Sequence, residues 1–312
     1  MITSASLDVQ ENKEPYRAYL SLIEQLNTVF ERLSGGFVTS NDVDIIADQL
    51  LDLVREERLK AAGYILCGKV EGRELAKNSI NTAILSALTA KEFKASGRIV
   101  LQLVTGALLH DTGMLRLPPN ILRKRGGLSG AELQQMQAHP LHSYHIICQA
   151  LSYPDDIGRI AMQHHERWDG GGYPLGVAGA AIVLEARIIS VADAFEAMVS
   201  EKPYRDSIIG YQAMKNLLSD NSSRFDPDVL KAFIKIMGIY PIGSLVLLNN
   251  KAVAQVVEVR GDAPLRPRVR ILIDETGGSS KPNEEPVLDL LNEKSFFIVK
   301  ALDSREVAAK SE

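Results

Sequence analysis

The chain has 312 residues, of which 46% are apolar and 24% charged, and its formal net charge is −4. These are ordinary values for a globular protein, and the slight acidity excludes a surface that coats a nucleic acid polymer. The length is greater than one compact helical domain needs, so we expect two or three structural units.

The first 15 residues are polar and lack the apolar stretch of a secretory signal. No run approaches the ~20 apolar residues that a membrane-spanning helix needs. The two cysteines, Cys67 and Cys148, lie apart in apolar helical patterns, which favours buried free thiols and a reducing compartment. We therefore expect a cytoplasmic protein with no membrane contact.

We expect residues 1–14 to be disordered and two amphipathic helices to follow them. Residues 15–33 repeat apolar side chains at spacings of three and four, which predicts the first helix. The polar run 39–42 is typical of a helix N-terminus and predicts a second helix to about Arg58. Further helical patterns cover residues 59–91, 96–109, 129–151, 154–165, 186–199, 209–219 and 226–237.

The pattern changes near residue 240, where short β-branched runs separated by turn residues begin. The runs 244–248, 252–259, 267–273 and 296–300 predict strands. The expected fold class is therefore mostly α, with a small β-rich module at the C-terminal end. We divide the chain into an N-terminal helical segment (1–70), a helical domain (71–238) and a β module with a frayed tail (239–312).

All six histidines lie between residues 110 and 165, and clustered His with Asp is the usual composition of a transition-metal site. Single parts of this cluster are ambiguous. The pair His110-Asp111 could be a helix end with a capping carboxylate, and Asp193 could form a salt bridge on its apolar helix. The adjacent His164 and His165 end an apolar helix, where burying two unpaired imidazoles would be costly, so metal ligation explains them better.

Taken in order, these segments resemble the HD-GYP family of HD-domain phosphohydrolases. The resemblance rests on ALLHDTGMLRLPPNIL (107–122), HPLHS (139–143), HHERWDGGGYPLG (164–176) and ISVADAFEAMVSEKPYR (189–205), and it covers about 74–235. It implies an all-helical domain and a bacterial signalling enzyme that hydrolyses cyclic di-GMP to pGpG, GMP or both. It also implies two or three divalent metals, iron or manganese, whose bridging hydroxide attacks phosphorus.

The resemblance assigns roles to individual residues. Asp111 would bridge two metals, and Asp111 and Glu196 would be the catalytic residues. His110 and Asp193 would complete one metal, and the other would be held by His139, His164 and His165. Cyclic di-GMP would be bound by Gly172, Tyr173, Lys202 and Arg205, although the glycine loop could also be a plain turn and the two cations ordinary surface charges.

Two positions depart from the family pattern. Asn78 stands where the opening helix usually offers a histidine, and it would be a weak metal ligand through its oxygen; Glu74, one turn earlier, matches a third-metal carboxylate of some members. Met114 replaces a lysine. Three hypotheses follow: an active phosphodiesterase, a metal-bound cyclic di-GMP sensor or scaffold without turnover, and a phosphohydrolase of another nucleotide. The segment 1–70 is expected to serve a homodimer or a signalling partner.

Overall fold

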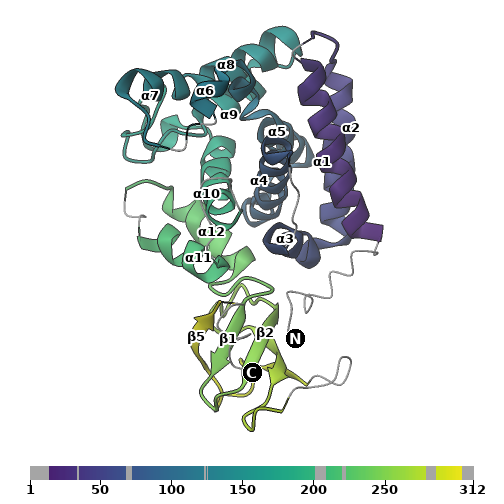
Figure 1. Ribbon diagram of the computed structural model, residues 1–312, viewed down its shortest axis with the longest axis vertical. Coiled ribbons are helices and arrows are strands. Elements are labelled where there is room, and N and C mark those ends of the chain that lie inside the picture. The colour runs from purple at the N-terminus through teal and green to yellow at the C-terminus, as the bar shows by residue number, and fades with distance from the viewer. Residues whose placement is uncertain are drawn as a thin grey trace.

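The computed structural model describes residues 14–33, 35–67, 72–122, 124, 126–200, 209–219, 223–278 and 286–303. In this part of the chain a helical body is followed by one five-stranded antiparallel sheet, which lies at one end of the molecule (Figure 1). The predicted fold class, mostly α with a small C-terminal β module, is confirmed. None of the described helices is both long and apolar enough to cross a membrane.

The N-terminal helices are α1 (Glu14–Leu33), α2 (Ser40–Glu56) and α3 (Arg58–Cys67). Helix α1 buries Tyr19, Leu22 and Leu26 on one face, as its apolar spacing predicts. Helix α2 begins after Thr39, whose backbone N–H donates to the Asp42 carboxylate at 2.8 Å and so satisfies one free group of the helix end. The first two helices pack against each other and lie along one side of the body (Figure 1).

Helix α4 (Glu74–Ala90) is the central element of the helical body. It is buried along almost its whole length and packs against α1, α2 and α3, and also against α5 (Gly97–Leu109), α10 (Leu184–Val199) and α12 (Pro227–Met237). One hydrophobic core runs from Tyr16 on α1 to Met237 on α12. The N-terminal helices thus share their core with the helices that follow, while the boundary at residue 70 stays a prediction.

The sequence pattern over 129–151 predicts one helix, but the structure divides it. Helix α7 (Gly130–Met136) ends before α8 (His139–His145), which continues into the π-helical turn η4 (Ile146–Ala150). Pro140, which lacks a backbone N–H, sits in the first turn of α8, where a new helix can begin. The remaining helical elements are α6 (Pro119–Leu122), α9 (Asp155–Gln163), α11 (Gly210–Ser219) and the short 3₁₀ turns η2 (Lys91–Phe93), η3 (Thr112–Arg116) and η5 (Gly179–Ala181).

The sheet has the strand order β4-β3-β2-β1-β5. Four strands lie close to the predicted runs, and the short β4 was not predicted because its three residues carry too little pattern. The module joins the helical body through Tyr240, whose ring stacks on Tyr211 of α11 with centroids 4.9 Å apart. The strand bounds are β1 (Leu245–Leu248), β2 (Val253–Glu258), β3 (Arg268–Ile273), β4 (Val287–Asp289) and β5 (Ile298–Leu302).

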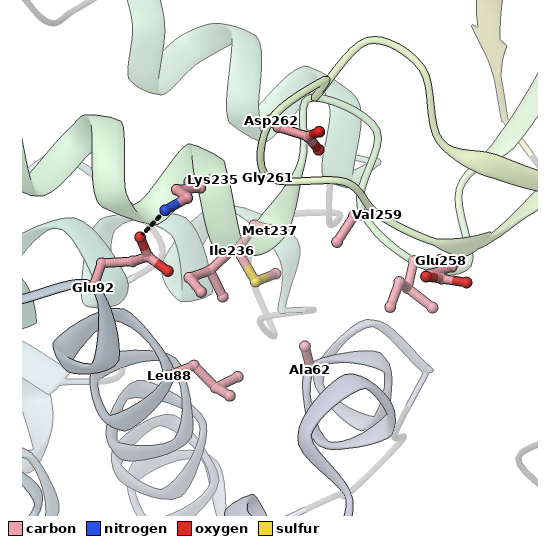
Figure 2. Close-up of a pocket in the computed structure, with 11 residues that line it drawn as sticks. Ala62, Leu88, Glu92, Lys235, Ile236, Met237, Glu258, Val259, Gly261 and Asp262 are labelled. Carbon is pink, nitrogen blue, oxygen red and sulfur yellow. Dashed lines mark hydrogen bonds and ion pairs between the residues drawn. The ribbon is translucent and has the colours of Figure 1, made fainter. Parts of the chain in front are cut away.

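A pocket of about 400 Å³ lies where the helical body meets the β module (Figure 2). Its lining includes the apolar Ala62, Leu88 and Met237, and the ion pair between Lys235 and Glu92 crosses one side of it. None of the histidines lines this pocket, so it is separate from the site described next.

Candidate metal centre

Asp111 is the centre of the histidine cluster. It follows His110, the C-cap residue of α5, and it directly precedes η3. Its Oδ1 lies 3.1 Å from His139 Nε2 and 3.6 Å from His164 Nε2, and its Oδ2 lies 3.5 Å from His110 Nε2. One carboxylate therefore faces three imidazoles that come from three separate helix ends.

The backbone fixes the tautomer of these three rings. The Nδ1 atoms of His110, His139 and His164 lie 2.6–2.7 Å from the carbonyl oxygens of Ala107, Met136 and Ala161, each three residues earlier. A carbonyl only accepts hydrogen bonds, so each Nδ1 carries the proton. In the neutral form of each ring, the Nε2 lone pair is then directed towards Asp111. Metal-binding histidines are held in this way, with the second ring nitrogen donating to a carbonyl.

His165 completes one side of the cluster. A ligand atom from each of Asp111, His139, His164 and His165 can be chosen so that all lie within 4.8 Å of one another. Burial, as the main cause, lowers the pKa of both His164 and His165, so these rings are neutral at pH 7. Neutral imidazoles are the form that binds a metal.

The other side of Asp111 brings His110 close to Asp193 of α10. His110 Nε2 lies 3.8 Å from Asp193 Oδ1. Burial opposes protonation of His110, but the carboxylates of Asp111 and Asp193 outweigh it and raise the pKa of this ring to about 9. Burial also acts against ionisation of Asp193, yet its interaction with His110 holds its pKa below the ordinary value. This half of the site has a strong affinity for a positive charge.

A close contact between η3 and α8 explains how His139 reaches Asp111. A Cβ on Gly113 would lie 2.0 Å from the carbonyl oxygen of His139, so only glycine fits there. The Gly113 N–H also donates to Ser143 Oγ at 2.8 Å. Neither Gly113 nor Ser143 is among the predicted site residues. The small residue after His110-Asp111 is the one signal that could have indicated this contact.

The loop after the histidine pair folds back on it. A Cβ on Gly172 would lie 2.4–2.6 Å from backbone atoms of residues 165–167, so this glycine permits the loop to pack on the chain. The buried Glu166 carboxylate accepts hydrogen bonds from the backbone N–H groups of Leu175 and Gly176 at 2.7 and 3.2 Å. Tyr173 consequently lies over His165, with ring centroids 4.8 Å apart. Burial, followed by the charges of Asp111 and Asp193, raises the pKa of the Tyr173 phenol, which keeps its proton at neutral pH.

The remaining predicted residues lie in different places. Asn78 and Glu196 are beside Asp193: the Asn78 amide donates to Glu196 Oε2 at 2.6 Å and to Asp193 Oδ1 at 3.3 Å. Glu74 is exposed at the start of α4, one turn before Asn78. Lys202 and Arg205 lie outside the described residues.

Buried polar atoms without a partner test whether these residues fit a metal ion. Three such atoms are His110 Nε2, Asp111 Oδ1 and Asn78 Oδ1. Leaving a buried polar atom unpaired costs roughly 1–3 kcal/mol, and a cation bound by these atoms would remove that cost. The donor set of imidazole and carboxylate groups around Asp111 therefore fits a divalent metal.

The comparisons with known proteins agree with this geometry. The HD-domain family matches residues 44–229, and a KOW domain associated with the HD domain matches residues 245–310. The fold and the His/Asp site thus define an HD domain, and the chain belongs to this family. Within it, the chain is a member of the HD-GYP branch, to which its GYP loop and relatives assign it.

Two relatives and one solved structure illustrate the similarity. The chain is 32% identical over 213 residues to cyclic di-GMP phosphodiesterase PA4108 of Pseudomonas aeruginosa, which covers 68% of this chain and 51% of that protein. It is 36% identical over 166 residues to 3'3'-cGAMP-specific phosphodiesterase 3 of Vibrio cholerae, covering 53% and 36%. Bd1817, a HDG"Y"P protein from Bdellovibrio bacteriovorus, shares the fold with a TM-score of 0.58 at 19% identity, over 73% of this chain and 74% of that one. The chain spans about half or less of the length of these two curated relatives.

Proposed function

We propose that this protein is a metal-dependent phosphodiesterase that hydrolyses cyclic di-GMP to pGpG, GMP or both. The observation that carries the proposal is the convergence of three Nε2 atoms on Asp111, with each ring fixed by a carbonyl behind it. The activity named for the Pseudomonas relative supports the substrate class.

The proposed centre would hold two metals, and Asp111 would be a ligand of both. His110 and Asp193 would hold the first metal, and His139, His164 and His165 the second. Imidazole and carboxylate ligands without a thiolate suit iron or manganese. Glu74 is the proposed ligand of a third metal. Divalent metals bound there supply Lewis acidity, which neutralises charge on a phosphate and acidifies water.

The proposed substrate contacts follow from the loop geometry. Tyr173, protonated and next to His165, can donate a hydrogen bond to a phosphate oxygen. Because Gly172 has no side chain, the loop backbone can lie close to residues 165–167, next to Tyr173. Lys202 and Arg205 would bind the phosphates, since an overall acidic chain needs local cations to attract a dianionic ligand.

A second function is favoured by one observation. The Asn78 amide donates to Asp193 and Glu196, so this side chain holds two carboxylates with its NH₂ group where the family usually has a metal-binding imidazole. Together with Met114, this supports a metal-bound cyclic di-GMP sensor that does not turn over. A homodimer or signalling partner through the N-terminal helices and a cytoplasmic location remain parts of the proposal.

The experiment that separates these functions measures product and binding in one preparation. The protein is purified without oxygen, loaded with Fe(II) or Mn(II), and given cyclic di-GMP or 3'3'-cGAMP, and nucleotide products are followed by chromatography. Cyclic di-GMP should be converted to pGpG or GMP by the parent chain and by His145→Ala, whose ring lies outside the cluster, but not by His164→Ala.

Three other results are informative. Tight binding of cyclic di-GMP without product would replace the hydrolase by the sensor. Preferential cleavage of 3'3'-cGAMP would correct the substrate. A chain that neither contains metal nor takes it up would refute both functions.

A further inference from the structure

A chain of buried hydrogen bonds connects the N-terminal helix α1 with the candidate metal centre. The Tyr19 hydroxyl donates to Asn81 Oδ1 at 2.9 Å, and Asn81 Nδ2 donates to Glu196 Oε1 at 3.1 Å. Asn78 Nδ2 then joins Glu196 Oε2 at 2.6 Å to Asp193 Oδ1 at 3.3 Å. We call these five residues the Tyr19–Asp193 chain.

The direction of each hydrogen bond is set by the groups at the ends. A carboxylate only accepts, so the amides of Asn78 and Asn81 must turn their NH₂ groups towards Glu196. Asn81 then presents its oxygen to α1, where the Tyr19 hydroxyl is the donor. Reversing one amide would place its oxygen against a buried carboxylate, which is costly. The arrangement therefore acts as one unit.

Glu196 occupies the middle of this chain and is saturated with donors. Its side chain is 1% exposed, and Ser200 Oγ donates a further hydrogen bond to Oε1 at 2.5 Å. A carboxylate with three donors and almost no exposure is held in one orientation. This geometry supports a positioning role for Glu196 in place of the predicted catalytic one.

The far end of the chain is fixed by aromatic packing. Tyr19 is 0% exposed, and its ring lies 5.9 Å from that of Tyr16 and 5.7 Å from that of Tyr64 on α3. The hydroxyl therefore moves only if α1 moves relative to α3 and α4. Helix α1 ends at Leu33, before the residues 44–229 that match the HD-domain family, so this anchor comes from outside the matched domain.

We propose that Tyr19 and Asn81 are positioning residues of the metal centre, through which α1 holds the Asp193 carboxylate in place to bind metal. Asn78 is the last link before Asp193, because its amide donates to both Glu196 and Asp193. The inference rests on the proposed metal site. The affinity for metal would then depend on the position of the N-terminal helix α1, which is separated from the Asp193 helix α10 by α4.

The test measures Mn(II) affinity of metal-free protein by titration calorimetry, with near-ultraviolet circular dichroism as the check that each variant is folded. Tyr19→Phe removes one hydroxyl and should weaken Mn(II) binding about threefold, and Asn81→Ala about tenfold, near the lower end of the effects of groups behind metal ligands. The matched control is Tyr64→Phe, which alters the same aromatic cluster but not the chain, and it should stay within about twofold of the parent.

A double-mutant cycle separates positioning from a general loss of stability. Because Tyr19 acts through Asn81, Tyr19→Phe should have no further effect on Mn(II) affinity once Asn81 is alanine. Equal affinity of Tyr19→Phe and the parent, or additive losses in the double variant, would overturn the proposal. If Asn81→Ala does not fold, the proposal is decided by comparing the Mn(II) affinity of Tyr19→Phe with that of Tyr64→Phe. A parent chain that binds no Mn(II) would instead refute the metal site itself, and this inference with it.

Discussion

The Nε2 atoms of His139 and His164 lie 3.4 Å apart, although each ring already donates its Nδ1–H to a backbone carbonyl. Neither ring, when neutral, has a proton left to place between the two nitrogens. Two lone pairs directed at each other are unfavourable unless a cation lies nearby. A bound metal ion would supply that cation, so the first prediction concerns metal uptake.

We expect added Mn(II) to raise the melting temperature of the parent chain and a chelator to reverse the rise. At a free metal concentration 100 times the Kd, binding to the folded state alone adds about 2.7 kcal/mol to the free energy of unfolding. His139→Ala and Asp111→Ala should lose most of this response, and His145→Ala should keep it. Thermal scans with and without metal measure the effect, and an unchanged response of Asp111→Ala would contradict the site.

The affinity for metal should increase as the pH rises from 6.5 to 9. The pKa of His110 is raised from 6.5 to about 9 in the metal-free protein, so a bound metal must displace its proton. Conversely, the stability that the protonated ring gives the metal-free protein is fully present below pH 6.5 and is lost as the pH passes 9. Calorimetry in two buffers of different ionisation enthalpy should detect proton release at pH 7.5. Binding without proton release would mean that His110 is not a ligand.

Gly113→Ala should destabilise the protein and disturb the metal centre together. The new Cβ would lie 2.0 Å from the His139 carbonyl, so α8 has to move, at a cost of about 1–3 kcal/mol. Gly97→Ala, at the start of α5, is the control: nothing lies within 4 Å of its Cβ, and we expect no loss of stability. Urea unfolding and Mn(II) titration of both variants test this. Equal behaviour of the two variants would show that the close approach is unimportant.

Glu166→Ala should loosen the loop that carries Tyr173. The change leaves the backbone N–H groups of Leu175 and Gly176 without their acceptor, which costs about 1–3 kcal/mol. Because Glu166 is not among the proposed metal ligands, Mn(II) affinity should stay near that of the parent while KM for the cyclic dinucleotide rises. Steady-state kinetics beside the metal titration gives the comparison, and an unchanged KM would argue against a substrate role of the loop.

Tyr173→Phe tests the proposed phosphate contact more locally. The ring keeps its packing on His165, and only the protonated hydroxyl is removed. A donor to a charged oxygen contributes about 1.5–3 kcal/mol, so binding of a non-hydrolysed analogue should weaken roughly ten- to a hundredfold. Isothermal titration measures this, and an unaltered affinity would assign Tyr173 to packing alone.

Much of the fold could be predicted because it depends on local pattern. Apolar residues at spacings of three and four indicate α1 whatever it packs against, and β-branched runs between turns indicate most strands of the β module. The break of the predicted helix over 129–151 has a local signal in Pro140, which lies in the first turn of the new helix α8. The placement of α8 that brings His139 to Asp111 is a property of packing and not of the local sequence.

The sequence by itself determined the fold class, the HD-GYP resemblance and the set of histidines and aspartates, because residue type and spacing record which side chains can bind a metal. Only the tertiary structure decided how those side chains meet. The convergence of three Nε2 atoms on Asp111, the contact of Gly113 with His139 and the hydrogen bonds that lead from Tyr19 to Asp193 join residues from different elements. Such contacts depend on the relative position of helices, and a single sequence carries no direct information about that position.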